Sequence, residues 1–217
     1  MVKVKICGNQ TRDDIDASAG ADAVGFIIST PESSRNLTPG RAAKLVESVP
    51  LFTDTVLVTT ETKPEKLARL SKRVAPDYLQ LHSRLSEGEL RKIDSVVPGL
   101  IDLIGLLPVE GSGEELERKA RDLKESPVSG ILLDSKSGGR SGGTGETHDW
   151  ELSKRIRKAV DPFPVILAGG LEPGNVRKAV EKVKPYAVDA ASGLEIAGEK
   201  SPEKTNQFLK EVKENAT

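Results

Sequence analysis

The most constraining feature of this sequence is an alternation, along its whole length, between short apolar runs and longer charged segments. The apolar runs are rich in valine, isoleucine and leucine, and the segments between them repeat apolar residues at helical spacing. The predicted strands are Val2–Cys7, Ala23–Ile28, Phe52–Val58, Tyr78–Leu81, Leu100–Leu107, Gly130–Leu133, Pro164–Ala168 and Tyr186–Ala191. The predicted helices are Thr11–Ala19, Pro39–Val49, Pro64–Val74, Ser86–Val96, Gly113–Lys124, Asp149–Val160, Pro173–Val183 and Pro202–Glu214.

This alternation predicts a parallel β-sheet covered by helices. Continuous apolar strands are typical of parallel sheets, because both faces of such a sheet are buried. Several predicted helices begin at a proline, which the first helical turn tolerates. Eight strands in strict alternation with eight helices favour an α/β fold closed into a (β/α)₈ TIM barrel over an open sheet. The 217 residues suit a barrel of roughly 200–250 residues, and no linker divides them, so we expect a single catalytic domain over residues 1–217.

Composition narrows the class of protein. The 32 basic and 33 acidic residues leave a net charge of −1, which does not favour binding to nucleic acid or to an anionic membrane. We find neither a signal peptide nor an apolar run long enough to span a bilayer. The one cysteine, Cys7, excludes an internal disulfide and fits a reducing compartment. We therefore expect a soluble, cytoplasmic protein, either a monomer or a homodimer.

In a barrel of this kind the active site lies at the carboxyl ends of the strands. Cys7 is the last residue of the first predicted strand and Asp134 directly follows the sixth, and they form a candidate pair of general base and general acid. Cys7 could instead be a small buried hydrophobe, and Asp134 a structural cap. Arg35 could bind a carboxylate bidentately or simply face solvent. His82 could line a polar pocket, and two histidines are too few for a convincing zinc site, so no metal is expected.

Glycine-containing loops follow the last two predicted strands. Gly169, Gly170 and Gly193 would let backbone N–H groups approach an anion closely, and the Ser192 hydroxyl would add a donor. Single glycines often just fit tight turns, but two such loops at these positions of a barrel favour a phosphate site. The long loop from Lys136 to Thr147 could close as a lid over a ligand or could be an insertion without a role. Its central residues are Gly142, Gly143, Thr144 and Gly145.

Taken together, the sequence resembles the phosphoribosylanthranilate isomerases of tryptophan biosynthesis. The resemblance follows the whole chain in order, and it rests on Val4–Gly8, Gly20–Phe26, Ser33–Arg35, Leu79–His82, Ile131–Lys136, Gly142–Gly145, Ala168–Leu171, Pro173–Val176 and Val188–Glu195. One departure is Ala191, which stands where the family commonly has the first of two serines.

The resemblance implies an Amadori rearrangement of N-(5′-phosphoribosyl)anthranilate to 1-(2-carboxyphenylamino)-1-deoxyribulose 5-phosphate, with no cofactor. It implies that Asp134 is the general acid, Cys7 the general base and Arg35 the clamp for the anthranilate carboxylate. His82 and Asp189 are further candidates for substrate binding. The partner is then a small phosphosugar–anthranilate molecule.

Other functions remain as alternatives. A histidine-pathway or dual-substrate aminosugar phosphate isomerase would act on a related phosphosugar, but the histidine-pathway enzyme needs an aspartate where this chain has Cys7. Indole-glycerol-phosphate synthase would need a catalytic lysine in its early strands and an N-terminal extension. A phosphosugar-binding barrel without activity would be favoured by loss of the acid or the base, and both residues are present.

Overall fold

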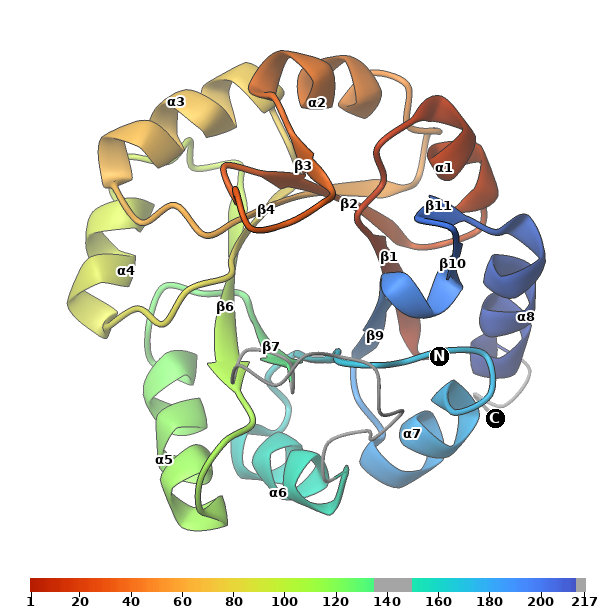
Figure 1. Cartoon of the computed structure of the whole chain (residues 1–217). Helices are drawn as coiled ribbons and strands as arrows, with labels where there is room; N and C mark the ends of the chain where they lie inside the picture. Colours follow the sequence, from red (N-terminus) through yellow and green to blue (C-terminus); the bar gives the residue numbers. More distant parts are fainter. Residues whose placement is uncertain (135–149, 214–217) are drawn as a thin grey trace.

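The predicted barrel is confirmed in the computed structural model, which describes residues 1–134 and 150–213. Its strands are β1 (Lys3–Cys7), β2 (Ala23–Ile28), β4 (Asp54–Thr59), β5 (Tyr78–Leu81), β6 (Asp102–Pro108), β7 (Gly130–Asp134), β8 (Val165–Leu167) and β9 (Ala187–Ala190). All pair in parallel in the order β1-β9-β8-β7-β6-β5-β4-β2, and β2 pairs with β1 to close the ring. Figure 1 looks down this ring, with the helices outside it.

The helices are α1 (Arg12–Ala17), α2 (Pro39–Val46), α3 (Pro64–Val74), α4 (Glu87–Asp94), α5 (Gly113–Lys124), α6 (Trp150–Val160), α7 (Val176–Val183) and α8 (Pro202–Lys213). As expected, α2, α3 and α8 begin at prolines. The expected start of α7 at Pro173 is wrong. Asn175 organises a turn before this helix, because its side chain accepts from Glu172 N at 3.0 Å and donates to Gly170 O at 2.9 Å. Asp149 and Glu214, two predicted helix ends, lie outside the described residues.

Four short elements among the described residues were not predicted. Strand β3 (Asn36–Leu37) lies in the loop after β2 and pairs in parallel with the end of β2. A 3₁₀ helix, η2 (Ser192–Leu194), follows β9 and leads into a hairpin of β10 (Glu195–Ile196) and β11 (Glu199–Lys200). Elements of two or three residues are too short to show periodicity, so the sequence gives no signal for them.

Strand alternation divides the core into an inner and an outer part. Side chains that point into the barrel include Cys7, Val58, Leu132 and Ile166. Those that point outward pack against the helices in two clusters. The first cluster joins β1 and β7–β9 to α5–α8, and the second joins β2, β4 and β5 to α1–α4. Leu123 and Phe163 pack against both clusters.

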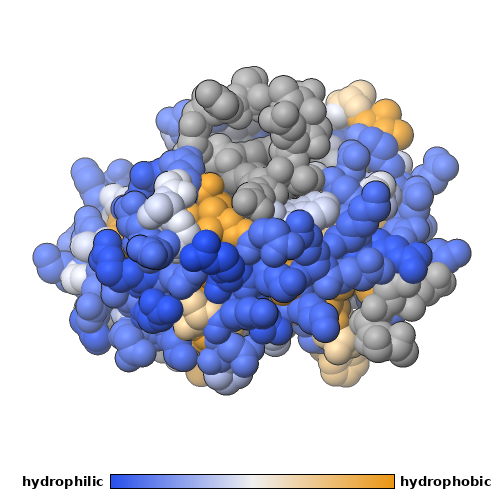
Figure 2. All heavy atoms as spheres, turned by 90° about the horizontal axis from the view of Figure 1, so that it is seen from below, coloured by the Kyte–Doolittle hydropathy of each residue, from blue (hydrophilic) through white to orange (hydrophobic). Residues whose placement is uncertain are grey.

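The outer surface of the helix ring is polar where α5, α6 and α7 lie. Figure 2 views the molecule from this side, and the face is mostly hydrophilic with small separate apolar areas. Ion pairs such as Arg155–Glu117 and Lys182–Glu151 link neighbouring helices there. No helix within residues 1–134 and 150–213 combines the length and the apolarity needed to span a bilayer.

Candidate active site

A pocket of about 480 Å³ opens at the carboxyl ends of the strands. Eight of the residues singled out in the sequence line it: Cys7, His82, Asp134, Gly169, Gly170, Asp189, Ser192 and Gly193. Arg35 is not among the described residues that line this pocket, although its neighbour Ser33 is. The four predicted lid residues, Gly142, Gly143, Thr144 and Gly145, lie outside the described residues.

Cys7 is the last residue of β1, and it is buried with 7% of its surface exposed. Burial raises the pKa of its thiol, and the positive charge of Lys5 opposes part of that rise. A general base needs a pKa near the working pH. Burial of Cys7 therefore disfavours the thiolate that a base requires, whereas the charge of Lys5 favours it. Gly25, opposite Cys7 on β2, provides the space for the thiol, because a Cβ there would lie 2.9 Å from Cys7 Sγ.

Lys5 is the principal residue of this site that the sequence reasoning missed. Its Nζ lies 2.7 Å from Asp189 Oδ2, and both side chains are buried. Burial lowers the pKa of Lys5, but the charges of Asp189 and Cys7 outweigh this and raise it, so the amine stays protonated. A signal was available: Lys5 and Cys7 are two residues apart on one strand, so both must point into the barrel.

Asp134 ends β7, which is separated from β1 by β9 and β8 in the ring, and its side chain lines the same pocket as Cys7. Its Oδ2 lies 3.6 Å from His82 Nε2, and the Gln80 amide nitrogen lies 3.4 Å from His82 Nδ1. Burial lowers the pKa of His82 despite the charge of Asp134, so the imidazole is neutral at pH 7. If Gln80 donates to Nδ1, the proton of His82 is on Nε2 and faces the Asp134 carboxyl group.

The two glycine loops contact one another. Gly169 and Gly170 follow β8 with φ values of 88° and 69°, which only glycine adopts readily. Gly193 lies in η2, where a Cβ would be 2.1 Å from the carbonyl oxygen of Leu171 in the other loop. The loops therefore depend on glycine both for backbone conformation and for close packing.

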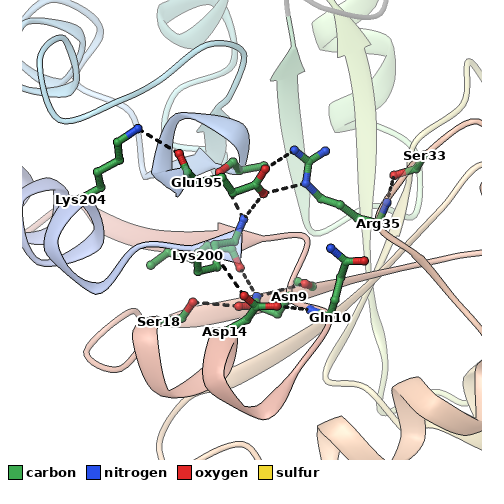
Figure 3. A network of polar contacts seen from close by, with 12 residues as sticks. Asn9, Gln10, Asp14, Ser18, Ser33, Arg35, Glu195, Lys200 and Lys204 are labelled. Carbon is green, nitrogen blue, oxygen red and sulfur yellow. Dashed lines mark hydrogen bonds and ion pairs between the residues drawn. The ribbon is translucent and has the colours of Figure 1, made fainter. Parts of the chain in front are cut away.

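Arg35 lies over the loop after β1 and forms an ion pair with Glu195 (Figure 3). Its Nε lies 2.7 Å from Glu195 Oε1, and its Nη2 donates to Oε2. Gly8 makes room for this side chain, since a Cβ at Gly8 would be 2.5 Å from Arg35 Cδ. The sequence reasoning did not identify Glu195 as the partner of Arg35.

Glu195 also joins Arg35 to the loop after β9. Lys200 Nζ donates to Glu195 Oε1 at 2.6 Å and to the Ala191 carbonyl at 3.2 Å. Burial tends to raise the pKa of Glu195, but hydrogen bonds from Arg35 and Lys200 outweigh it and lower the pKa. The carboxylate therefore stays ionised between two cations, and the cluster keeps an excess positive charge beside the pocket.

Two buried acceptors of the pocket have no hydrogen-bond partner within the part of the chain that the structure describes. They are Asp189 Oδ1 and Gln80 Oε1. Such groups are rare in folded proteins and are commonly satisfied by a ligand or by water. Because both are acceptors, a ligand that satisfies them must supply O–H or N–H donors.

Comparison with known proteins gives consistent matches. The family model for N-(5′-phosphoribosyl)anthranilate (PRA) isomerase matches residues 4–211. N-(5′-phosphoribosyl)anthranilate isomerase 1 of Methanosarcina mazei is 42% identical, over 97% of this chain and 94% of its own.

Solved structures of such isomerases agree. A complex with reduced 1-(o-carboxyphenylamino)-1-deoxyribulose 5-phosphate has a TM-score of 0.80 at 33% identity, covering 99% of this chain and 100% of its own. A structure of monomers generated from the dimeric enzyme of Thermotoga maritima has a TM-score of 0.82 at 32% identity, with the same coverage.

Proposed function

The chain belongs to the N-(5′-phosphoribosyl)anthranilate isomerase family, and on that premise we propose that Cys7 is the general base and Asp134 the general acid of the reaction. The activity is an isomerisation in tryptophan biosynthesis. The observation that carries the assignment is that both side chains line one pocket from different strands, β1 and β7. Groups in this arrangement can act on two different atoms of one bound sugar.

The two groups act in sequence. Asp134 donates a proton to the furanose ring oxygen, the C1–O bond breaks, and the anthranilate nitrogen supplies the electrons for a protonated Schiff base. The Cys7 thiolate then removes the proton from C2. The electrons of that C–H bond form a C1=C2 double bond, and the electrons of the C1=N π bond return to the nitrogen as a lone pair, which neutralises it. The resulting enol-amine becomes the ketone when C1 gains a proton and the C2 hydroxyl loses one.

We assign the phosphate of the substrate to Gly169, Gly170, Ser192 and Gly193. The two loops that carry these residues contact each other beside the pocket. Backbone N–H groups next to glycines can approach phosphate oxygens without obstruction by a Cβ. Because Ala191 replaces a serine common in the family, Ser192 and the backbone carry more of this binding.

Replacing Gly193 with alanine should raise KM by about tenfold, with a smaller change in kcat. The new Cβ would collide with the Leu171 carbonyl, and relieving such a clash costs about 1–3 kcal/mol by separating the loops. Steady-state kinetics checks this. Gly88→Ala is the matched control, because nothing lies within 4 Å of a Cβ at that position in α4. Equal KM values for the two variants would exclude Gly193 from the phosphate site.

The unpartnered acceptors suit the sugar. A ribose-derived substrate carries hydroxyl donors, so we assign Asp189 Oδ1 to a sugar hydroxyl, together with Gln80 Oε1. We also assign His82 to a substrate contact beside Asp134. The support is that its neutral imidazole lines the same pocket.

We assign Arg35 to the anthranilate carboxylate. A carboxylate that enters the pocket would meet the excess positive charge of the Arg35–Glu195–Lys200 cluster. Arg35→Ala should therefore raise KM about tenfold or more while kcat changes less, because a hydrogen bond to a charged group contributes about 1.5–3 kcal/mol. Arg35→Lys keeps the charge but loses the bidentate geometry, so its KM should lie between that of the unmodified enzyme and that of Arg35→Ala. An unchanged KM in Arg35→Ala would remove Arg35 from the site.

The activity itself is tested by fluorescence. Phosphoribosylanthranilate, generated in situ, is followed with and without the protein, and we expect a protein-dependent fall in its anthranilate-type fluorescence. Cys7→Ser should lose this fall. A correctly folded protein that caused no fall would contradict the proposal and favour the aminosugar of the histidine pathway or a binding role.

We further expect a monomer or a homodimer in the cytoplasm, where a free thiol such as Cys7 stays reduced. The exposed apolar side chains Leu51, Phe52 and Leu100 lie just before β4 and β6, at the end of the barrel opposite the pocket. A homodimer formed there would leave the pocket open, and sedimentation velocity distinguishes the two states.

A further inference from the structure

We propose that Lys5 is a positioning residue of the isomerase, which increases the fraction of Cys7 in the thiolate form by placing a buried ammonium group next to it. This proposal rests on the assignment of Cys7 as the general base. It adds a residue that does not touch the reacting atoms and acts through its neighbours on β1 and β9.

The register of the strands sets up this contact. Lys5 pairs with Asp189 of β9, and Cys7 pairs with Gly25 of β2. Lys5 is 3% exposed, and its Nζ lies 2.7 Å from Asp189 Oδ2. The ammonium group is therefore fixed inside the barrel, on the same face of β1 as the thiol.

Gly25 shows that the ammonium group and the thiol are neighbours. A Cβ at Gly25 would lie 2.9 Å from Cys7 Sγ and 3.3 Å from Lys5 Nζ, so both groups pack against the same glycine. The two groups also interact electrostatically, since Lys5 favours the thiolate form of Cys7. One ammonium group thus lies beside two groups, the Asp189 carboxylate, to which it donates, and the Cys7 sulfur.

Packing alone does not explain a lysine at this position. Several other residues that point into the barrel are apolar, such as Val56, Ile104 and Ile166. A buried ion pair costs desolvation energy, and well-packed apolar residues of similar size often stabilise a protein as well or better. The proposed role of Cys7 as a base explains a buried cation beside it, because a thiolate in a dry pocket needs a counter-charge.

The charges around Cys7 have opposing effects. Burial raises the pKa of the thiol, the charges of Lys5 and Lys200 lower it, and the charge of Asp189 raises it. Arg35 is a further cation in electrostatic contact with Cys7. Around Lys5 the charged or titratable groups are Asp189, Cys7 and His82. Among the cations, Lys5 has the largest effect on the thiol.

The test is a pH titration of the Cys7 thiolate without substrate, followed by its ultraviolet absorbance and by the rate of alkylation with iodoacetamide. Cys7→Ser supplies the background. The double variant Lys5→Met/Asp189→Asn removes the ammonium group without leaving an unpaired buried carboxylate. We expect its thiolate midpoint to move upward by about one pH unit or more. Its kcat should fall most at neutral pH and recover as the pH rises.

Lys3→Met is the matched control. Lys3 lies on the same strand and pairs with Asp22, but it is largely exposed at the far end of the barrel, so its loss should leave the midpoint unchanged. Asp189→Asn alone should lower the midpoint, and this variant decides the matter if the double variant does not fold. An unchanged midpoint in the double variant, or no downward shift in Asp189→Asn, would overturn the proposal. Because substrate is absent, these results are independent of whether Cys7 is the base, which the kinetics of Cys7→Ser decide.

Discussion

Replacing Cys7 with serine should lower kcat about 10²–10⁴-fold, the usual cost of losing a proton-transfer group, with a much smaller change in KM. Serine fills the same space against Gly25, so the fold and substrate binding should persist. Its hydroxyl ionises far less readily than a thiol and cannot remove the C2 proton at a useful rate. Steady-state kinetics with the fluorescent substrate measures the effect, and circular dichroism checks the fold. A kcat close to that of the unmodified enzyme would show that Cys7 is not the base.

The same assignment fixes the pH dependence of the reaction. Burial raises the pKa of Cys7, so the thiol predominates at neutral pH and the reactive thiolate increases as the pH rises. The value of kcat/KM should therefore rise with pH over the range in which the Cys7 thiol ionises. Cys7→Ser should lose this rise. If the rise persisted in that variant, it would have to come from the ionisation of another group.

Replacing Asp134 with asparagine should lower kcat by a similar factor, about 10²–10⁴-fold. The amide keeps the shape of the side chain beside His82 but has no acidic proton to give to the ring oxygen. KM should change far less than kcat, because the ring oxygen gains its proton during the reaction and not on binding. Kinetics of the purified variant measures both constants.

Asp102→Asn is the control for Asp134→Asn. Asp102 begins β6 at the opposite end of the barrel and accepts from the Ser129 hydroxyl. The two variants change the net charge of the protein equally, so a difference in kcat reports the position of the carboxylate. If Asp134→Asn retained the kcat of Asp102→Asn, the ring oxygen would receive its proton from elsewhere.

Much of the fold was predictable because the signals are local. The ends of β2, β5, α3 and α5 follow from the apolar period, proline positions and turn residues, and they agree with the structure. The start of α7 was misplaced, because Pro173 gives the same local signal whether it begins a helix or a turn. What decides between them is the pair of hydrogen bonds from Asn175 to its own loop.

Residues of the candidate site were predictable only where their position at the end of a strand was enough to identify them. Cys7, Asp134 and the glycine loops come from the rule that strand ends form the site, and the structure brings them to one pocket. The partners of these residues depend on contacts far apart in the sequence. Lys5 and Asp189 are 184 residues apart, and Arg35 and Glu195 are 160 apart. Such pairs need the barrel register and the loop geometry, which a period in the sequence does not contain.

The division of the outer core into two clusters has a consequence for how the site responds to local opening. Cys7, Asp134 and both glycine loops are carried by strands that the first cluster supports, whereas Arg35 and His82 follow strands that the second supports. Proteins open in cooperative units that tend to follow such packing boundaries. Partial unfolding of the second unit would loosen the proposed grip on the aromatic end of the substrate while the acid, the base and the phosphate loops kept their spacing. The part of the barrel that carries Arg35 and His82 can thus fluctuate separately from the part that carries the proposed acid and base.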